Sequence, residues 1–126
     1  MKKLIIDTHI LIWWLIAPEK LKQRHLEIIQ NEKNIVYVSI ASFFEISLKV
    51  KKGKLEFNDD FENILSENGF QLLPISLKHL EKLQETLFTH QDPFDMIIIA
   101  QSLSENIELI SYDEQFKDVE GLRMLQ

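Results

Sequence analysis

Short apolar runs alternate with helical patterns along the whole chain, and this alternation limits the possible folds more than any other feature of the sequence. Five runs are predicted strands, the last of them at an edge: residues 4–6, 35–38, 70–75, 107–110 and 122–125. Strands that are separated by helices form parallel sheets with both faces covered. The pattern therefore predicts an α/β fold with a central parallel sheet of four to five strands.

Capping residues mark the helices between these strands. Ser39 and Ser76 are typical N-caps, and Pro93 suits the first position of a helix. Gly53 and Gly69 suit the positions just beyond two helix ends. The predicted helices cover residues 8–16, 19–32, 40–52, 58–68, 77–88 and 93–105, with a short helical turn at 113–117.

Length and composition indicate an ordinary globular protein and exclude several kinds of site. The chain has 126 residues, which is the usual size of one domain, so we expect residues 1–126 to form a single domain. Cysteine is absent, which excludes disulfides, thiolate metal sites and cysteine nucleophiles. The apolar segment 10–17 has only 8 residues, whereas about 20 are needed to span a bilayer. We therefore expect a cytoplasmic protein with no membrane contact.

Acidic residues lie beside the carboxyl ends of the predicted strands, where open parallel sheets bind their ligands. Asp7 and Asp113 follow the first and fourth strands, and Glu45 lies in the helix after the second. Asp92 and Asp95 open the helix that precedes the fourth strand. Carboxylates that converge repel each other unless a cation such as Mg²⁺ or Mn²⁺ compensates them. Such a site could polarise a phosphoryl oxygen and activate water, so the pattern indicates metal-assisted phosphodiester hydrolysis.

Each of these acids also has a purely structural interpretation. Asp7 could cap the helix at 8–16, and Asp113 could cap the turn at 113–117. Asp92 suits the N-cap of the 93–105 helix, and Asp95 suits its N3 position. The functional interpretation therefore depends on the convergence of the acids, because no single position carries it.

Lysines immediately follow Glu45, although the net charge of the chain is −6 and argues against binding nucleic acid through overall charge. Glu45 and Lys49 have the spacing of an i,i+4 ion pair, but the many apolar neighbours of Glu45 make simple surface decoration a poor explanation. The four lysines could form a rim that binds RNA phosphates, or a solvated helix end. They are Lys49, Lys51, Lys52 and Lys54.

The two adjacent tryptophans are predicted to pack in the core or at an interface rather than to stack on bases. Trp13 and Trp14 lie in an apolar predicted helix, which favours packing. His9 is the histidine nearest to the predicted acidic site, and we expect it to have a structural or surface role. The histidines show no metal-ligand spacing.

Four blocks of the sequence resemble the PIN-domain family and, within it, the VapC-like toxin ribonucleases of bacterial toxin–antitoxin systems. The blocks occur in the family's order and span nearly the whole chain. They are residues 4–9 (LIIDTH) with Trp13 and Trp14, residues 38–49 (VSIASFFEISLK) continuing to 53–55, residues 90–101 (HQDPFDMIIIAQ) and residues 109–116 (LISYDEQF).

This resemblance implies a three-layer α/β/α fold and a Mg²⁺- or Mn²⁺-dependent endoribonuclease. It implies that Asp7, Glu45, Asp95 and Asp113 bind the metal and activate water, with Asp92 as an auxiliary residue. The resemblance also implies a homodimer and a small antitoxin protein that blocks the active site.

Three positions depart from the family pattern without removing a carboxylate. Met96 and Tyr112 stand where basic residues are frequent, and Phe44 replaces a frequent tryptophan. These changes affect how RNA would be held more than the metal chemistry. Two other functions stay open on the sequence: an RNA- or protein-binding module with weak or no catalysis, and a nuclease that processes RNA without being a toxin.

Overall fold

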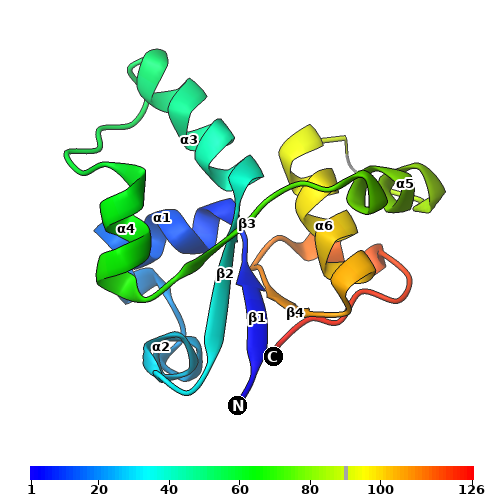
Figure 1. Cartoon of the computed structure of the whole chain (residues 1–126), viewed down its shortest axis with the longest axis horizontal. Helices are drawn as coiled ribbons and strands as arrows, with labels where there is room; N and C mark the ends of the chain where they lie inside the picture. The colour runs from blue at the N-terminus through cyan, green and yellow to red at the C-terminus, as the bar shows by residue number, and fades with distance from the viewer. Residues whose placement is uncertain (90) are drawn as a thin grey trace.

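Four parallel strands form the centre of the protein, in the order β3-β2-β1-β4 (Figure 1). The computed structural model describes residues 1–89 and 91–126, so His90, the first residue of the third motif block, lies outside the described residues. In the register of the sheet, Ile6 lies opposite Val38 on one side and Ile110 on the other. The strands are β1 (Lys3–Ile6), β2 (Ile35–Ser39), β3 (Gln71–Leu73) and β4 (Glu108–Ile110).

The edge strand predicted at residues 122–125 is not formed. A single parallel bridge joins Met124 to Leu109. Its two hydrogen bonds run from the Leu109 N–H to the Arg123 carbonyl and from the Leu125 N–H to the Leu109 carbonyl, each at 2.9 Å. Pairing around one residue does not make a strand, so the sheet has four strands and this segment only closes its edge.

The helices follow the predicted order, with one correction. The segment predicted as a helix at 19–32 is a 3₁₀ turn and a shorter helix, because Leu21 between them is extended and points into the core with 6% of its surface exposed. The helices are α1 (Thr8–Ile16), η1 (Pro18–Lys20), α2 (Gln23–Gln30), α3 (Ile40–Lys51), α4 (Phe61–Asn68), α5 (Leu77–Glu85), α6 (Pro93–Glu105) and η2 (Glu114–Asp118).

Local capping explains where most of these helices begin and end. The Ser39 hydroxyl accepts the Ala41 N–H at 3.0 Å and starts α3, and Asp60 starts α4 in the same way. Gly69 ends α4 with a φ of 68°, a left-handed conformation that glycine adopts without steric cost. Ser76 starts α5, which stops at Glu85, short of the predicted end at 88.

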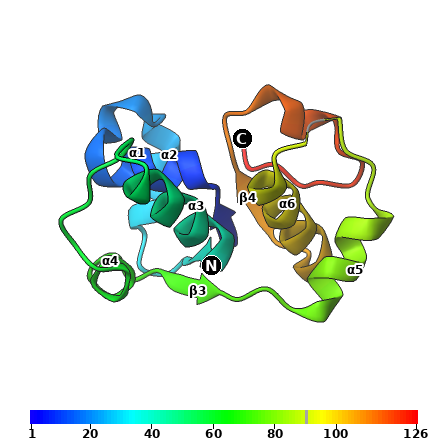
Figure 2. The same cartoon turned by 90° about the horizontal axis from the view of Figure 1, so that it is seen from above.

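Helices cover both faces of the sheet, which confirms the predicted three-layer α/β/α fold (Figure 2). Side chains alternate along a strand, so Leu4 and Ile6 enter one core while Ile5 enters the other. The first core packs against α1, α2, α3 and α4, and the second against α5 and α6. Trp13 and Trp14 pack against the first core, as predicted.

None of the helices that the structure describes is both long enough and apolar enough to cross a bilayer.

Candidate active site

Asp7 connects the central strand β1 to α1. Its Oδ1 accepts a hydrogen bond from the Ile10 N–H at 2.9 Å, so it is the N-cap that the sequence predicts. Only 2% of the residue is exposed, and this burial raises the pKa of its carboxyl group. The charge of Asp113 raises the pKa further, whereas a hydrogen bond with the Ser111 side chain opposes the rise. Asp7 is therefore a buried acid that faces a second acid from a neighbouring strand end.

Asp113 and Asp92 are also helix caps, as their structural interpretations predict. Asp113 follows β4, and its Oδ1 accepts the Gln115 N–H at 2.9 Å. The Asp92 Oδ1 accepts the N–H groups of Phe94 and Asp95, at 2.9 and 3.3 Å. Both residues are exposed, unlike Asp7. In each cap, one carboxylate oxygen accepts backbone hydrogen bonds, and these bonds fix the orientation of the aspartate side chain.

Glu45 enters the same region from α3. Only 7% of the residue is exposed, so Glu45 is a buried acid and not part of the solvent-exposed surface of α3. Its Oε2 lies 3.3 Å from Nζ of Lys49, which forms the i,i+4 ion pair that the spacing predicts. Helix α3 packs against α6, and this contact brings Glu45 toward the start of α6. The ammonium group of Lys49 partly compensates the charge of a nearly buried carboxylate.

Asp95 is the acid whose carboxyl group is affected by the charges of the other four. It lies in the first turn of α6 and is 7% exposed. Burial raises the pKa of its carboxyl group to about 7 from the usual 3.8, and the charges of neighbouring acids add to the rise. The contributing acids, from the largest effect to the smallest, are Asp92, Asp7, Glu45 and Asp113. The structure thus brings all five acids of the sequence analysis into one electrostatic cluster.

The cluster has suitable donors for a divalent cation. Within residues 1–89 and 91–126, no three His, Asp or Glu side chains lie in an arrangement that could hold a metal ion as they stand. The donor chemistry nevertheless fits a hard cation, because the converging groups are carboxylates and their mutual repulsion adds to the effect of burial on the pKa of Asp95. A divalent cation would remove that repulsion. The candidate ligands are Asp7, Glu45, Asp95 and Asp113.

A cavity of about 310 Å³ lies beside the cluster. Its acidic side is formed by Glu45 and Asp92, and its basic side by three of the four predicted lysines. The fourth, Lys51, is exposed and does not line the cavity. The basic lining residues are Lys49, Lys52 and Lys54.

Tyr112 holds the segment next to Asp113 in place, a role that the sequence did not predict. Its hydroxyl accepts the Lys22 N–H at 3.0 Å and lies 2.7 Å from Nδ1 of His25. Burial lowers the pKa of His25, so the ring is neutral and we assign the hydroxyl as the donor to Nδ1. The two rings stack at 5.4 Å. This network ties the residue before Asp113 to α2, and no local pattern could reveal a contact across 87 positions.

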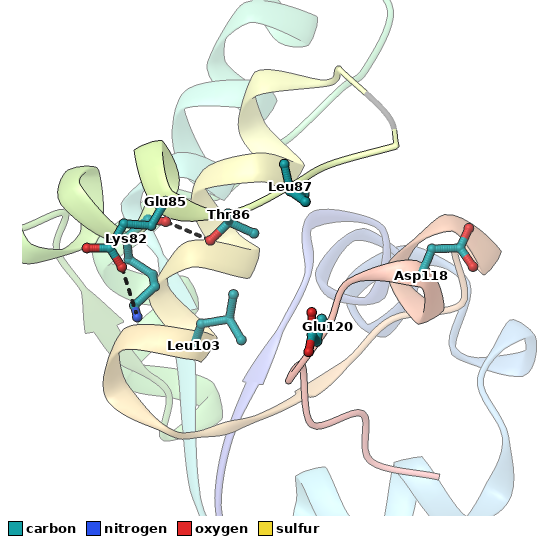
Figure 3. A pocket seen from close by; sticks show the side chains of 7 residues that line it. All are labelled: Lys82, Glu85, Thr86, Leu87, Leu103, Asp118 and Glu120. Atoms are coloured by element: carbon teal, nitrogen blue, oxygen red, sulfur yellow. Dashed lines mark hydrogen bonds and ion pairs between the residues drawn. The ribbon is translucent and has the colours of Figure 1, made fainter.

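A second cavity, of about 350 Å³, lies between α5 and the segment around residues 118–120 (Figure 3). Three of the polar residues that line it already have partners. Lys82 forms an ion pair with Glu85 at 3.4 Å, and the Lys82 carbonyl accepts the Thr86 hydroxyl at 2.6 Å. None of the predicted site residues lines it. The acidic cluster therefore remains the candidate active site.

Comparisons with known proteins agree with this fold. Residues 4–122 match the family model described as PIN domain. No curated protein matches the sequence. A structure of VapBC2 from Rickettsia felis bound to a promoter DNA fragment is similar with a TM-score of 0.71 and 17% identity, over 98% of this chain and 97% of that chain. DNA-bound VapBC from Salmonella typhimurium is similar with a TM-score of 0.69 and 15% identity, over 99% of this chain and 98% of that chain. A toxin–antitoxin complex from Klebsiella pneumoniae is similar with a TM-score of 0.63 and 22% identity, over 94% of this chain and 93% of that chain. At these identities the likeness establishes the fold.

Proposed function

Because the chain belongs to the PIN domain family, whose members are generally nucleases, we propose that it is a metal-dependent endoribonuclease and the toxin of a toxin–antitoxin pair. The observation that carries the proposal is the acidic cluster around Asp95, where burial and four other carboxylates raise the pKa to about 7. Capping of α6 alone does not explain this convergence, because Asp7, Glu45 and Asp113 come from other parts of the chain. We also propose that residues 1–126 act as a single domain in the cytoplasm.

In this proposal, Asp7, Glu45, Asp95 and Asp113 hold Mg²⁺ or Mn²⁺. The bound cation would polarise a phosphoryl oxygen of RNA and lower the pKa of a water molecule. Asp7 and Asp113 are each anchored by a backbone N–H, which leaves one oxygen of each carboxylate outside the cap bond. Asp95 must lose its proton to act as a ligand. Asp92 caps α6, and its negative charge raises the pKa of Asp95 but would also attract a cation.

The lysines beside the cluster are proposed to hold the RNA backbone. Lys49, Lys52 and Lys54 line the 310 Å³ cavity, and Lys49 also forms an ion pair with Glu45. An acidic protein that binds RNA needs such a local reversal of charge. Lys51 is proposed as a more distant phosphate contact, because it is exposed outside the cavity.

The proposed partners are RNA, an antitoxin protein and a second copy of the chain. Among structures with a similar fold, the one from Klebsiella pneumoniae is a toxin–antitoxin complex by name, and VapBC-5 from Mycobacterium tuberculosis is by name a member of a family of toxin–antitoxin systems. This supports an antitoxin as a protein partner. The homodimer is proposed on the family resemblance.

Cleavage of labelled single-stranded RNA by purified protein tests the proposal, with Mn²⁺, Mg²⁺ or EDTA. Asp7→Asn is the informative variant, because asparagine keeps the cap of α1 but removes the charge. Asp118→Asn is the matched control, since Asp118 lines the other cavity. We expect metal-dependent cleavage by the wild type and the control, and none by Asp7→Asn. Full cleavage by Asp7→Asn, or cleavage in EDTA, would refute the metal mechanism.

A further inference from the structure

Two phenylalanines directly precede two of the clustered acids. Phe44 precedes Glu45 on α3, and Phe94 precedes Asp95 on α6. Their rings meet edge to face, with centroids 5.3 Å apart and planes at 90°. The pair therefore bridges α3 and α6 at the point where these helices bring their carboxylates together.

Phe44 is not part of the hydrophobic core. Its neighbour Phe43 is 3% exposed and packs against Phe61 at a centroid distance of 4.5 Å. Phe44, in contrast, is 59% exposed. An aromatic ring left in solvent on a helix loses the stabilisation that burial would provide. The edge-to-face contact with Phe94 uses only part of the Phe44 ring, and the rest of its surface is open to a ligand.

The aromatic pair lies beside the basic cavity. Phe94 lines the cavity together with Lys52 and Lys54. Successive residues of a helix point about 100° apart, so each ring flanks its carboxylate rather than covering it. The same cleft thus offers carboxylates for a metal, ammonium groups for phosphates and an aromatic surface.

We infer that Phe44 and Phe94 form a stacking platform for an unpaired nucleobase next to the phosphate that is cleaved. This inference rests on the proposed function and deepens it by naming the residues that would hold a base beside the cleaved phosphate. Base stacking on aromatic rings beside a basic groove is how single strands are bound with little sequence preference. A base-paired RNA cannot present a base face to the pair, so double-stranded RNA is excluded as a substrate.

RNA is favoured over a protein partner as the ligand of this surface. The cavity next to Phe44 has an apolar part, formed by Leu48 and Pro93, and a basic part, formed by Lys49, Lys52 and Lys54. A protein segment with apolar side chains would match only the apolar part. Phosphates of a nucleic acid match these cations, and its bases match the rings. Once a metal ion is bound, the neighbouring carboxylates suit the phosphodiester group that links the bases.

The test compares kcat/KM with Mn²⁺ on single-stranded RNAs that carry one abasic residue at successive positions. Phe44→Leu keeps an apolar side chain without a π face, and Phe44→Trp restores one. We expect Phe44→Leu to lower kcat/KM about tenfold on intact RNA and to leave it unchanged on the RNA that lacks the stacked base. Phe44→Trp should behave as the wild type. Leu77→Ala is the control, because Leu77 is also an exposed apolar residue, at 77%, but lies on α5.

A second readout separates this inference from the proposed function. RNA with 2-aminopurine at the position found above is mixed with protein in Ca²⁺, and stacking on an aromatic ring should quench its fluorescence with the wild type and Phe44→Trp but not with Phe44→Leu. Equal quenching by all three proteins would overturn the stacking platform, and so would an equal loss of kcat/KM on intact and abasic RNAs. If the wild type cleaves no RNA, the proposed function fails, and the quenching experiment decides the inference with RNAs that carry 2-aminopurine at successive positions.

Discussion

Replacing Asp95 with asparagine should stabilise the metal-free protein at neutral pH while abolishing its activity. The Asp95 carboxyl group has a pKa of about 7 in the folded chain, compared with 3.8 for an unperturbed aspartate. A raised folded pKa means that the native state binds the proton more tightly than the unfolded state does. The stability contributed by Asp95 is therefore fully present below about pH 4 and is lost as the pH rises toward 7. Asparagine is neutral at every pH and avoids this loss.

The size of the effect follows from the pKa difference. Each pKa unit corresponds to about 1.4 kcal/mol, so the rise from 3.8 to about 7 amounts to about 4 kcal/mol above neutral pH. Between about pH 5 and pH 8, Asp95 alone should lower the free energy of unfolding by about 3 kcal/mol. This is a large share of the 5–15 kcal/mol that is typical of a domain, roughly a fifth to three-fifths.

The assay is urea denaturation in EDTA of the wild type and Asp95→Asn at several pH values. The difference between the two proteins is the informative quantity, because other titrating groups such as Asp7 and His25 are present in both. This difference should grow in favour of Asp95→Asn as the pH rises. Saturating Mn²⁺ should then stabilise the wild type by about 3 kcal/mol at 100 times its Kd, and the variant by much less. Asp118→Asn, which changes an exposed acid, serves as the control.

Parallel pH profiles for the wild type and Asp95→Asn would refute the reasoning, because they would mean that Asp95 is already ionised without cost in the folded protein. A variant that is less stable than the wild type at about pH 8 would refute it as well.

Three further perturbations test separate parts of the structure. Tyr112→Phe removes the hydroxyl that pairs with the buried Nδ1 of His25 and should lower the free energy of unfolding by about 1–3 kcal/mol in urea denaturation; an unchanged midpoint would contradict this hydrogen bond. Lys52→Gln combined with Lys54→Gln should weaken binding of all single-stranded RNAs alike and reduce the slope of log K against log salt by about 0.7 per lysine; an unchanged slope would remove the lysines from the RNA path. Ile98→Ala, at a fully buried position, should cost about 2–5 kcal/mol in the same denaturation assay, and a cost below 1 kcal/mol would show that the core around it collapses.

Elements whose ends depend on local chemistry could be predicted from the sequence. Asp7, Ser39 and Asp92 accept backbone N–H groups at the helix starts where their residue types predict it. The interruption near Leu21 could not be predicted, since a buried leucine fits a helix and an extended segment equally well. The segment 122–125 has strand-forming residues, but only Met124 finds a partner on β4.

The convergence of the acids was predictable because parallel strands end at the same edge of a sheet. The two interpretations of these acids proved compatible, since Asp7 and Asp113 cap helical elements and also raise the pKa of a neighbouring acid. The extent of the effect on Asp95 could not be predicted, because it depends on burial and on charges from distant segments. The contrast between buried Phe43 and exposed Phe44 is likewise a matter of packing.

The strand order has a consequence for the way the protein is made. Strand β1 is synthesised first, yet it lies between β2 and β4, and β4 comes from the last fifth of the chain. A growing chain on the ribosome therefore leaves one side of β1 unpaired until residues 108–110 emerge, and Asp113 follows only after that. A product of translation that stops before residue 113 lacks an acid of the cluster. Under the proposed function, such a truncated chain should have no activity.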